Sequence, residues 1–362
     1  MQNRLVKQLN LCVGKNIPFV SYRLPHETSI HTRLQLSGKI NYVEYPNEVF
    51  DKEGFIYAPF HRRTDFPVIF FEPETIIEND KFDNILLEKI KSLPPLYPDY
   101  EIKPPEQVTK EEYFKMAEKF VDRFNDDFKK AVLSRVKIVS KPKDFDPAGY
   151  FLQLTKNYPN AFCHLIHIPG AGTWTGATPE TLLRSDIQTT KTVALAGTLS
   201  SKGKKTWKEK ETNEQQIVTD YIEKLLIEFG IKNYKKEKTT TVRAGNALHL
   251  STGFTFATKE IKDRLPDFIE KLHPTPAVCG LPKEKALDLI LDTEKHNREY
   301  YSGFLGTVNV NGKTDLFVNL RCMKILKKEL ALFAGGGLTK QSQPEKEWEE
   351  TELKAKTLLS CL

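Results

Sequence analysis

The spacing of short β-type segments is the feature that most constrains how this 362-residue chain can fold. Runs rich in β-branched and aromatic residues recur along it, and several are joined by short polar turns, for example at 309–315. A short turn reverses the direction of the chain, whereas parallel strands need a longer crossover, usually a helix. Strands and helices also mix without a regular alternation. The pattern therefore predicts an α+β fold with large antiparallel sheets.

The expected elements can be placed along the chain from their periodicity. Strands are predicted at 18–22, 33–36, 55–59, 66–71, 132–139, 162–168, 182–184, 191–195, 239–243, 304–310, 316–322 and 330–333. Helices are predicted at 109–129, 205–229, 283–292 and 344–359. The first helix starts with a capping box of Thr109 and Glu112. The proline-rich segment 91–107 is predicted to be a linker or an external loop.

Composition and charge exclude several classes of function. Hydrophobic residues make up 39% and charged residues 28%, which is typical of a globular chain. The net charge of +6 is spread over stretches of mixed sign, so no nucleic-acid partner is expected. No apolar run reaches the roughly 18 residues that a bilayer span needs, and no secretion signal is recognisable. Five dispersed cysteines predict neither disulfides nor zinc, so we expect a cytoplasmic protein with no membrane partner.

Two of the predicted helices carry paired carboxylates, Glu211 with Glu214 and Glu347 with Glu350. Residues three apart share one helix face, and each pair lies in line with apolar residues that the helix would bury. Charges on helices are usually solvated, but the alignment of both pairs with core-facing residues weakens that interpretation. Carboxylates without neighbouring His or Cys suit a hard ion such as Mg²⁺. A solvated face and a magnesium site are both open interpretations here.

Several single residues have two interpretations each. The glycine triplet 335–337 follows a strand, where it could form a tight turn or an anion-binding loop. Arg321, predicted within a strand, needs an anion, either an internal carboxylate or one on a substrate. His249 between two leucines is more often a core histidine than a catalytic one. Lys130, at a junction of helix and strand, would usually be solvated.

Eight short motifs resolve much of this ambiguity. They are KAVLSR (130–135), GATPE (176–180), ALAGT (194–198), HPTPA (273–277), REYYSG (298–303), LRC (320–322), AGGG (334–337) and EWEETELK (347–354). Their order resembles the chorismate-utilising enzymes, a family that includes isochorismate, salicylate, anthranilate and aminodeoxychorismate synthases. The resemblance implies one α+β chorismate-binding domain, like anthranilate synthase component I, with two packed antiparallel sheets and outer helices. Residues 1–100 would be its variable, sheet-rich part and 101–362 its catalytic region.

Two positions indicate a branch of that family. Lys130 stands where the water-using members carry a lysine, and Ala196 stands where aminodeoxychorismate synthases carry a nucleophilic lysine. The resemblance thus implies an isomerase of the isochorismate synthase type, as in menaquinone or catechol siderophore biosynthesis. Such an enzyme adds water at C2 of chorismate and removes the C4 hydroxyl. Salicylate synthase, anthranilate synthase component I and an inactive chorismate-binding regulator remain alternatives. A monomer without a glutaminase subunit is expected.

The resemblance also assigns roles by position. Lys130 would be the general base that deprotonates the attacking water, and Glu180 the general acid that protonates the leaving hydroxyl. A lysine base must be desolvated or lie near other cations, and a carboxylic acid donor needs a raised pKa.

Further positions match a metal site and substrate contacts. Glu214 and Glu350 would bind Mg²⁺, with Glu211 and Glu347 binding through water or orienting these ligands. The ion would clamp the ring carboxylate of chorismate. The implied substrate contacts are Gly197, Thr198, His249, Tyr301, Arg321, Gly335, Gly337 and Lys354.

Overall fold

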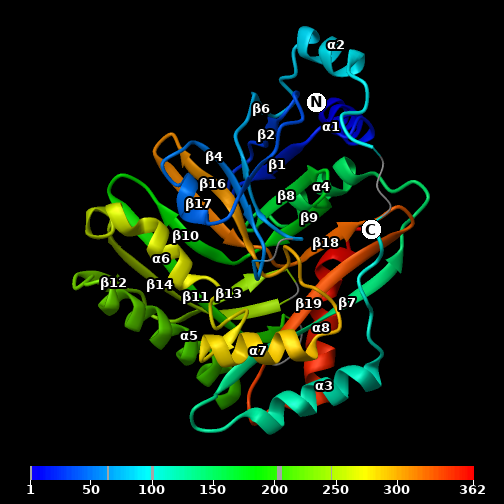
Figure 1. Cartoon of the computed structure of the whole chain (residues 1–362). Helices are drawn as coiled ribbons and strands as arrows, with labels where there is room; N and C mark the ends of the chain where they lie inside the picture. The colour runs from blue at the N-terminus through cyan, green and yellow to red at the C-terminus, as the bar shows by residue number, and fades with distance from the viewer. Residues whose placement is uncertain (1, 63–64, 99–101, 202–205, 246) are drawn as a thin grey trace.

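Antiparallel strand pairing organises the whole molecule, as the short turns predict. The computed structural model describes residues 2–62, 65–98, 102–201, 206–245 and 247–362. Within these ranges the strands form two sheets with helices along their outer sides (Figure 1). The predicted α+β class with two large antiparallel sheets is therefore confirmed.

The first sheet has nine strands among the described residues. Their order is β15 (Gly280–Leu281), β7 (Lys130–Ser140), β19 (Glu329–Leu338), β18 (Cys322–Ile325), β9 (Gly172–Thr178), β8 (Phe162–Ile168), β1 (Phe19–Arg23), β2 (His31–Leu34) and β6 (Thr75–Glu78). β7 and β19 form a long ladder from Ala131 paired with Leu338 to Ser140 paired with Glu329.

The second sheet has a path of nine strands with a tenth alongside, again counted over the described ranges. The path is β12 (Tyr234–Lys236), β14 (Ala247–Ala257), β11 (Thr189–Ser200), β10 (Thr181–Ser185), β17 (Lys313–Val318), β16 (Phe304–Val310), β4 (Gly54–Ala58), β5 (Val68–Phe71) and β3 (Asn41–Val43). β13 (Thr240–Ala244) pairs with β14. Thus β1, β2 and β6 extend the first sheet, and β3, β4 and β5 extend the second.

The helices cover these sheets through apolar faces. They are α1 (Gln2–Gly14), α2 (Asn84–Ser92), α3 (Lys110–Arg123), α4 (Pro147–Asn157), α5 (Glu209–Glu228), α6 (Leu265–Leu272), α7 (Lys283–Thr293) and α8 (Pro344–Leu359), with short 3₁₀ turns at Pro46–Val49, Thr258–Glu260 and Lys262–Arg264. A hydrophobic core lies between the two sheets and contains residues of both. Trp174 and Phe333 come from the first sheet, and Phe317 comes from the second. In the described ranges, no helix combines the length and the hydropathy that a membrane span requires.

Two predicted elements are wrong for identifiable reasons. The helix predicted at 109–129 ends at Arg123, because Phe124 has an extended backbone with ψ of 132°. The Asn125 side chain then accepts a hydrogen bond from the amide of Asp127 and closes a turn. The strand predicted at 316–322 divides into β17 and β18, because Arg321 has a φ of 48°, a left-handed conformation that a strand cannot contain.

Other boundaries differ less. The helix predicted at 205–229 begins at Glu209, and residue 205 itself lies outside the described residues. Within the described residues, the structure adds four helices and six strands that the sequence pattern did not predict, namely α1, α2, α4, α6, β3, β6, β9, β12, β14 and β15.

Candidate active site

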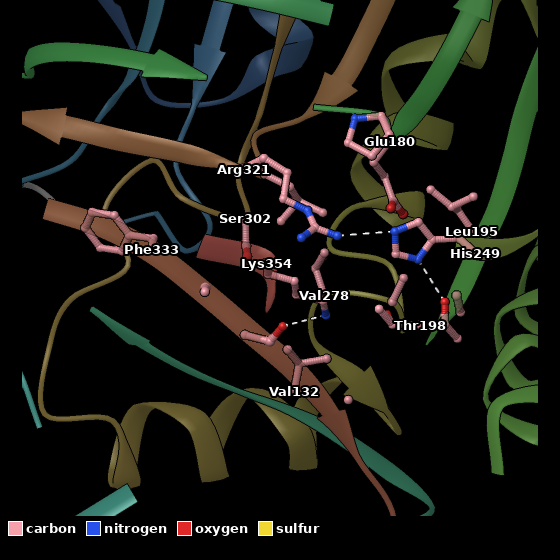
Figure 2. A pocket seen from close by; sticks show the side chains of 18 of the residues that line it. Val132, Glu180, Leu195, Thr198, His249, Val278, Ser302, Arg321, Phe333 and Lys354 are labelled. Carbon is pink, nitrogen blue, oxygen red and sulfur yellow. Dashed lines mark hydrogen bonds between the residues drawn. The ribbon is translucent and has the colours of Figure 1, made fainter. Parts of the chain in front are cut away.

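A cavity lined by both sheets brings together ten of the predicted site residues. It holds about 640 Å³ of empty space, a volume that includes its open mouth. These ten residues are Glu180, Gly197, Thr198, Glu214, His249, Tyr301, Arg321, Gly335, Gly337 and Lys354. Positions far apart in sequence therefore meet in one place (Figure 2).

Glu180 projects into this cavity from a rigid turn after β9. The Glu180 amide donates to Oγ1 of Thr178 at 3.2 Å, and the Thr178 hydroxyl donates to the carbonyl of Val318 at 2.6 Å. The amide of Val318 in turn donates to the Glu180 carbonyl at 2.9 Å. Figure 2 shows the carboxyl group of Glu180 inside the cavity.

The environment of Glu180 favours its protonated form. Its side chain is buried, and burial raises its pKa to about 8, although nearby Lys130, Lys354 and Arg321 oppose the shift. A carboxyl group with this pKa carries a proton near neutral pH, as a general acid must.

Arg321 and His249 form a connected pair on another wall. His249 Nδ1 lies 2.8 Å from the Gly197 carbonyl, so Nδ1 is the donor and Nε2 accepts from Arg321 Nη2 at 3.2 Å (Figure 2). Burial, with Arg321 and Lys354, lowers the pKa of His249 to about 3, so the ring is neutral. His249 therefore orients Arg321 and is not itself charged.

The remaining nitrogen of Arg321 is available to a ligand. Nη1 is buried and has no hydrogen-bond partner within the described structure. No ion pair joins Arg321 to a carboxylate in those same ranges, so the internal salt bridge considered from the sequence is not seen. An unpaired buried guanidinium donor fits an incoming carboxylate.

Lys130 lies behind this cavity, at the first residue of β7. Its side chain is fully buried, and its Nζ forms an ion pair at 2.9 Å with Oε1 of Glu214 on α5. The angles at this contact do not meet hydrogen-bond geometry. A Cβ atom at Gly337 would clash with the Glu214 carboxylate and would lie 2.8 Å from Cε of Lys130. Only glycine at 337 leaves room for this pair.

The glycine triplet 335–337 forms neither the tight turn nor the anion-binding loop that the sequence allowed. It lies inside β19. Gly335 pairs with Ser134 and Gly337 with Val132, and the amides of Ser134 and Val132 donate to acceptors on the far side of β7. These are therefore non-hydrogen-bonded pairs, and the N–H and C=O groups of Gly335 and Gly337 point away from β7.

The open side of β19 faces the cavity. β18 pairs with β19 only as far as Leu332, so the glycines beyond it have a free edge. Lys354 Nζ uses that edge and donates to the Gly335 carbonyl at 2.7 Å (Figure 2). Tyr301 stacks on Phe333 nearby, and burial raises the pKa of Tyr301 to about 12, so its hydroxyl stays protonated.

The carboxylates of α8 lie in a neighbouring cavity that shares Thr198 with the first. Glu211, Glu347 and Glu350 line it. The pKa of Glu350 lies below its ordinary value. Burial acts against this lowering, but Lys354, whose Nζ lies 2.7 Å from the Glu350 carboxylate, and Lys210 outweigh the effect of burial. One Glu211 oxygen accepts from the Lys208 amide at 3.0 Å and so caps α5.

Glu347 is the most deeply buried of these carboxylates. Burial and the nearby Glu350 raise the pKa of Glu347 to about 7, although Lys210 pairs with one of its oxygens. The other oxygen, Oε2, has no partner among the described residues. Sequence reasoning missed Lys210, because a lysine beside an acidic pair on a helix normally indicates a solvated face.

These residues fit a hard divalent cation by their chemistry. In the described ranges no group of three or more His, Cys, Asp or Glu side chains is placed to hold a metal ion. Mg²⁺ typically takes only one or two protein carboxylates and completes its coordination with water and substrate oxygens. Carboxylate oxygens of Glu347 and Glu350 approach Gly336, and one of Glu214 approaches the next residue, Gly337, so these three side chains meet at neighbouring positions of β19. Oε2 of Glu347 has no partner among the described residues.

A buried ion pair that was not predicted supports the cavity walls. Arg298 Nη1 donates to the Val278 carbonyl at 2.8 Å and Nη2 to the Val132 carbonyl at 2.7 Å, and both valines line the cavity. Glu294 holds the same guanidinium, with Oε1 2.6 Å from Nη2. The REYYSG motif contains Arg298, which was the available signal.

Comparison with known proteins identifies the family. EntC of Escherichia coli K12, an isochorismate synthase, is 27% identical over 241 residues, 64% of this chain and 61% of EntC. The chain thus spans about three fifths of the length of that curated relative.

Two solved structures share the fold. They are DhbC of Bacillus anthracis (TM-score 0.79, 22% identity, 100% of this chain and 99% of that one) and the menaquinone-specific isochorismate synthase MenF of Escherichia coli (TM-score 0.76, 19% identity, 95% and 88%). A family model described as chorismate binding enzyme matches residues 72–362. The chain therefore belongs to the chorismate binding enzyme family.

Proposed function

We propose that this protein is an isochorismate synthase, an isomerase that converts chorismate to isochorismate. The observation that carries the proposal is the buried Glu180 carboxyl, whose pKa of about 8 keeps it protonated in a cavity that also holds Arg321 and Lys354. A dianionic substrate that must lose a hydroxyl group needs this combination of cations and a proton donor. The similarity to EntC agrees with the same activity.

Binding of chorismate would use the donors that the cavity leaves available. Arg321 offers its unpaired Nη1 to the enolpyruvyl carboxylate, and His249 fixes the orientation of the guanidinium. Tyr301 adds a protonated hydroxyl. The amides of Gly335 and Gly337 at the open edge of β19 would donate hydrogen bonds to oxygen atoms of the substrate, as would Thr198 and Lys354, which also line the cavity.

The reaction would then need one base and one acid. Lys130 would accept a proton from the water that attacks C2. Its ammonium group must first give up a proton, for example to its partner Glu214, so that a neutral amine is available. Glu180 would give its proton to the C4 hydroxyl, so that the C4–O bond breaks with loss of water while the ring double bond shifts. One water adds and one leaves, so the net reaction is an isomerisation.

We further propose that Glu214 and Glu350 hold Mg²⁺, with Glu211 and Glu347 contributing through water. When bound, the ion would reduce the electrostatic repulsion between the ring carboxylate of the substrate and these glutamate side chains. The cysteines are all free within the described structure, which agrees with a reducing, cytoplasmic location. We propose a monomer that needs no glutaminase subunit.

Product analysis tests the proposal. The purified protein is incubated with chorismate and Mg²⁺, and the products are separated by chromatography and identified by mass. Isochorismate should form, EDTA should abolish it, and Lys130→Ala and Glu180→Gln should each remove turnover. Lys129→Ala, the exposed neighbouring lysine, is the matched control and should retain activity.

Other products would select the alternatives. Accumulation of salicylate with pyruvate would replace the assignment by salicylate synthase. Anthranilate formed only with ammonia would replace it by anthranilate synthase component I. Tight chorismate binding without any turnover would indicate an inactive regulator.

A further inference from the structure

Three carboxylates of the proposed metal site are each paired with one lysine. The pairs of Nζ and carboxylate oxygen are Lys130 with Glu214 at 2.9 Å, Lys354 with Glu350 at 2.7 Å and Lys210 with Glu347 at 2.5 Å. Three ammonium groups thus balance three carboxylates within the protein itself. A divalent cation that binds the same carboxylates would meet these positive charges at short range, so the ion and the lysines compete.

The three lysines differ in how firmly the protein holds them. The Lys130 side chain is fully buried, and Nζ of Lys354 also donates to the Gly335 carbonyl at 2.7 Å. The Lys210 side chain is 22% exposed, and among the described residues its Nζ has a hydrogen bond and an ion pair with Glu347 alone. Lys210 lies in the first turn of α5 and lines the hollow that contains the α8 carboxylates. It is therefore the ammonium group that can move into solvent most easily.

Glu347 is the carboxylate that most needs this lysine. Its side chain is 1% exposed, and its Oε2 has no partner within the described structure. Glu347 Oε2 and Glu350 Oε1 both lie within 3.5 Å of the ideal Cβ position of Gly336, so the two carboxylates face the same small space. Burial acts against the charge of Lys210, but the carboxylates around it raise its pKa. The lysine thus supplies the positive charge that this space requires.

We propose that Lys210 is an internal counter-ion that competes with Mg²⁺ for Glu347 and so sets the affinity of the metal site. The lysine stabilises the buried carboxylate until the ion binds, and it then moves toward solvent. Because this ion pair must break, the site binds Mg²⁺ less tightly than its carboxylates alone would allow. Lys210 is a positioning residue, since it acts through Glu347. The inference rests on the proposed magnesium site but not on the identity of the reaction.

Calorimetric titration of the full-length protein with MgCl₂ at physiological ionic strength tests this competition without any turnover. Lys210→Gln removes the competing charge and should raise the Mg²⁺ affinity about tenfold. Lys210→Arg keeps the charge and should bind Mg²⁺ no more tightly than the wild type. Lys346→Gln is the matched control, because Lys346 is exposed and lines the same hollow, and it should change the affinity less than about threefold.

Thermal unfolding gives a second readout, which a general effect of surface charge would not move. In EDTA, Lys210→Gln should unfold at least about 3 °C below the wild type, because Glu347 stays buried without its counter-ion. Saturating Mg²⁺ should recover this loss, since the ion replaces the lysine as the partner of the carboxylates. Lys346→Gln should follow the wild type in both conditions.

The contrary results are distinct. Unchanged Mg²⁺ affinity in Lys210→Gln, or an equal gain in Lys346→Gln, would overturn the competition. Weaker Mg²⁺ binding in Lys210→Gln would also overturn it, because the lysine would then support the site. Absence of Mg²⁺ binding in the wild type and in Lys210→Gln would overturn it together with the proposed metal ligands. If the protein forms no isochorismate but Lys210→Gln binds Mg²⁺ more tightly, the counter-ion stands and the proposed function fails.

Discussion

Replacing Glu180 by glutamine should change how the stability of the protein depends on pH. The folded-state pKa of Glu180 is about 8, raised by burial from an ordinary value of 4.5. Folded protein therefore retains the proton through a range in which the unfolded chain has lost it. Because the folded state binds more protons, the free energy of unfolding should fall as pH rises from about 4.5 to about 8.

The size of this effect follows from the same values. Each pH unit in that window costs about 1.4 kcal/mol, so between pH 5 and pH 7.5 the wild type should lose about 3 kcal/mol through Glu180 alone. Glutamine has nearly the same shape and does not titrate. The stability difference between Glu180→Gln and wild type should therefore grow with pH by about this amount.

Urea unfolding at pH 5, 6, 7 and 7.5 measures this difference. Other titrating groups affect both proteins alike, so they cancel in the comparison. If the two stability profiles run parallel within about 1 kcal/mol, Glu180 ionises normally and cannot be the proton donor proposed here.

Three further changes have defined outcomes. Gly337→Ala should lower stability by about 1–3 kcal/mol in urea unfolding and abolish turnover, because the new methyl group clashes with Glu214 and Lys130; unchanged activity would refute the packing argument. Arg298→Gln should destabilise by about 3–5 kcal/mol, since its carboxylate partner stays buried and unpaired, and a loss below about 1 kcal/mol would contradict this. Glu350→Ala should remove Mg²⁺ binding in calorimetry together with Mg²⁺-stimulated turnover, and retained binding would exclude Glu350 as a ligand.

Local patterning was sufficient to predict much of the fold. β8, β16 and α8 have the predicted bounds, because their apolar residues alternate or recur at helical spacing with clear turn or proline signals at the ends. Helix α1 was missed although Leu5, Leu9 and Cys12 are buried at helical spacing. This spacing of apolar residues was the available signal for a helix.

The site was harder to derive because tertiary contacts create it. Nothing local to Arg321 indicates its left-handed backbone, which depends on the end of β17 and the start of β18 meeting at that residue. The free edge of β19 arises because β18 is short, and the ion pair of Lys130 with Glu214 joins a strand to a distant helix. The motifs identified which residues to examine, whereas their geometry required the fold.

The most direct test of the central claim follows the oxygen atom of the attacking water. Chorismate is incubated with the protein and Mg²⁺ in H₂¹⁸O, and the product is analysed by mass spectrometry with fragmentation. The account predicts isochorismate with one ¹⁸O in the hydroxyl at C2, and no product from Lys130→Ala. Unlabelled isochorismate, or labelled product formed at the normal rate by Lys130→Ala, would contradict it.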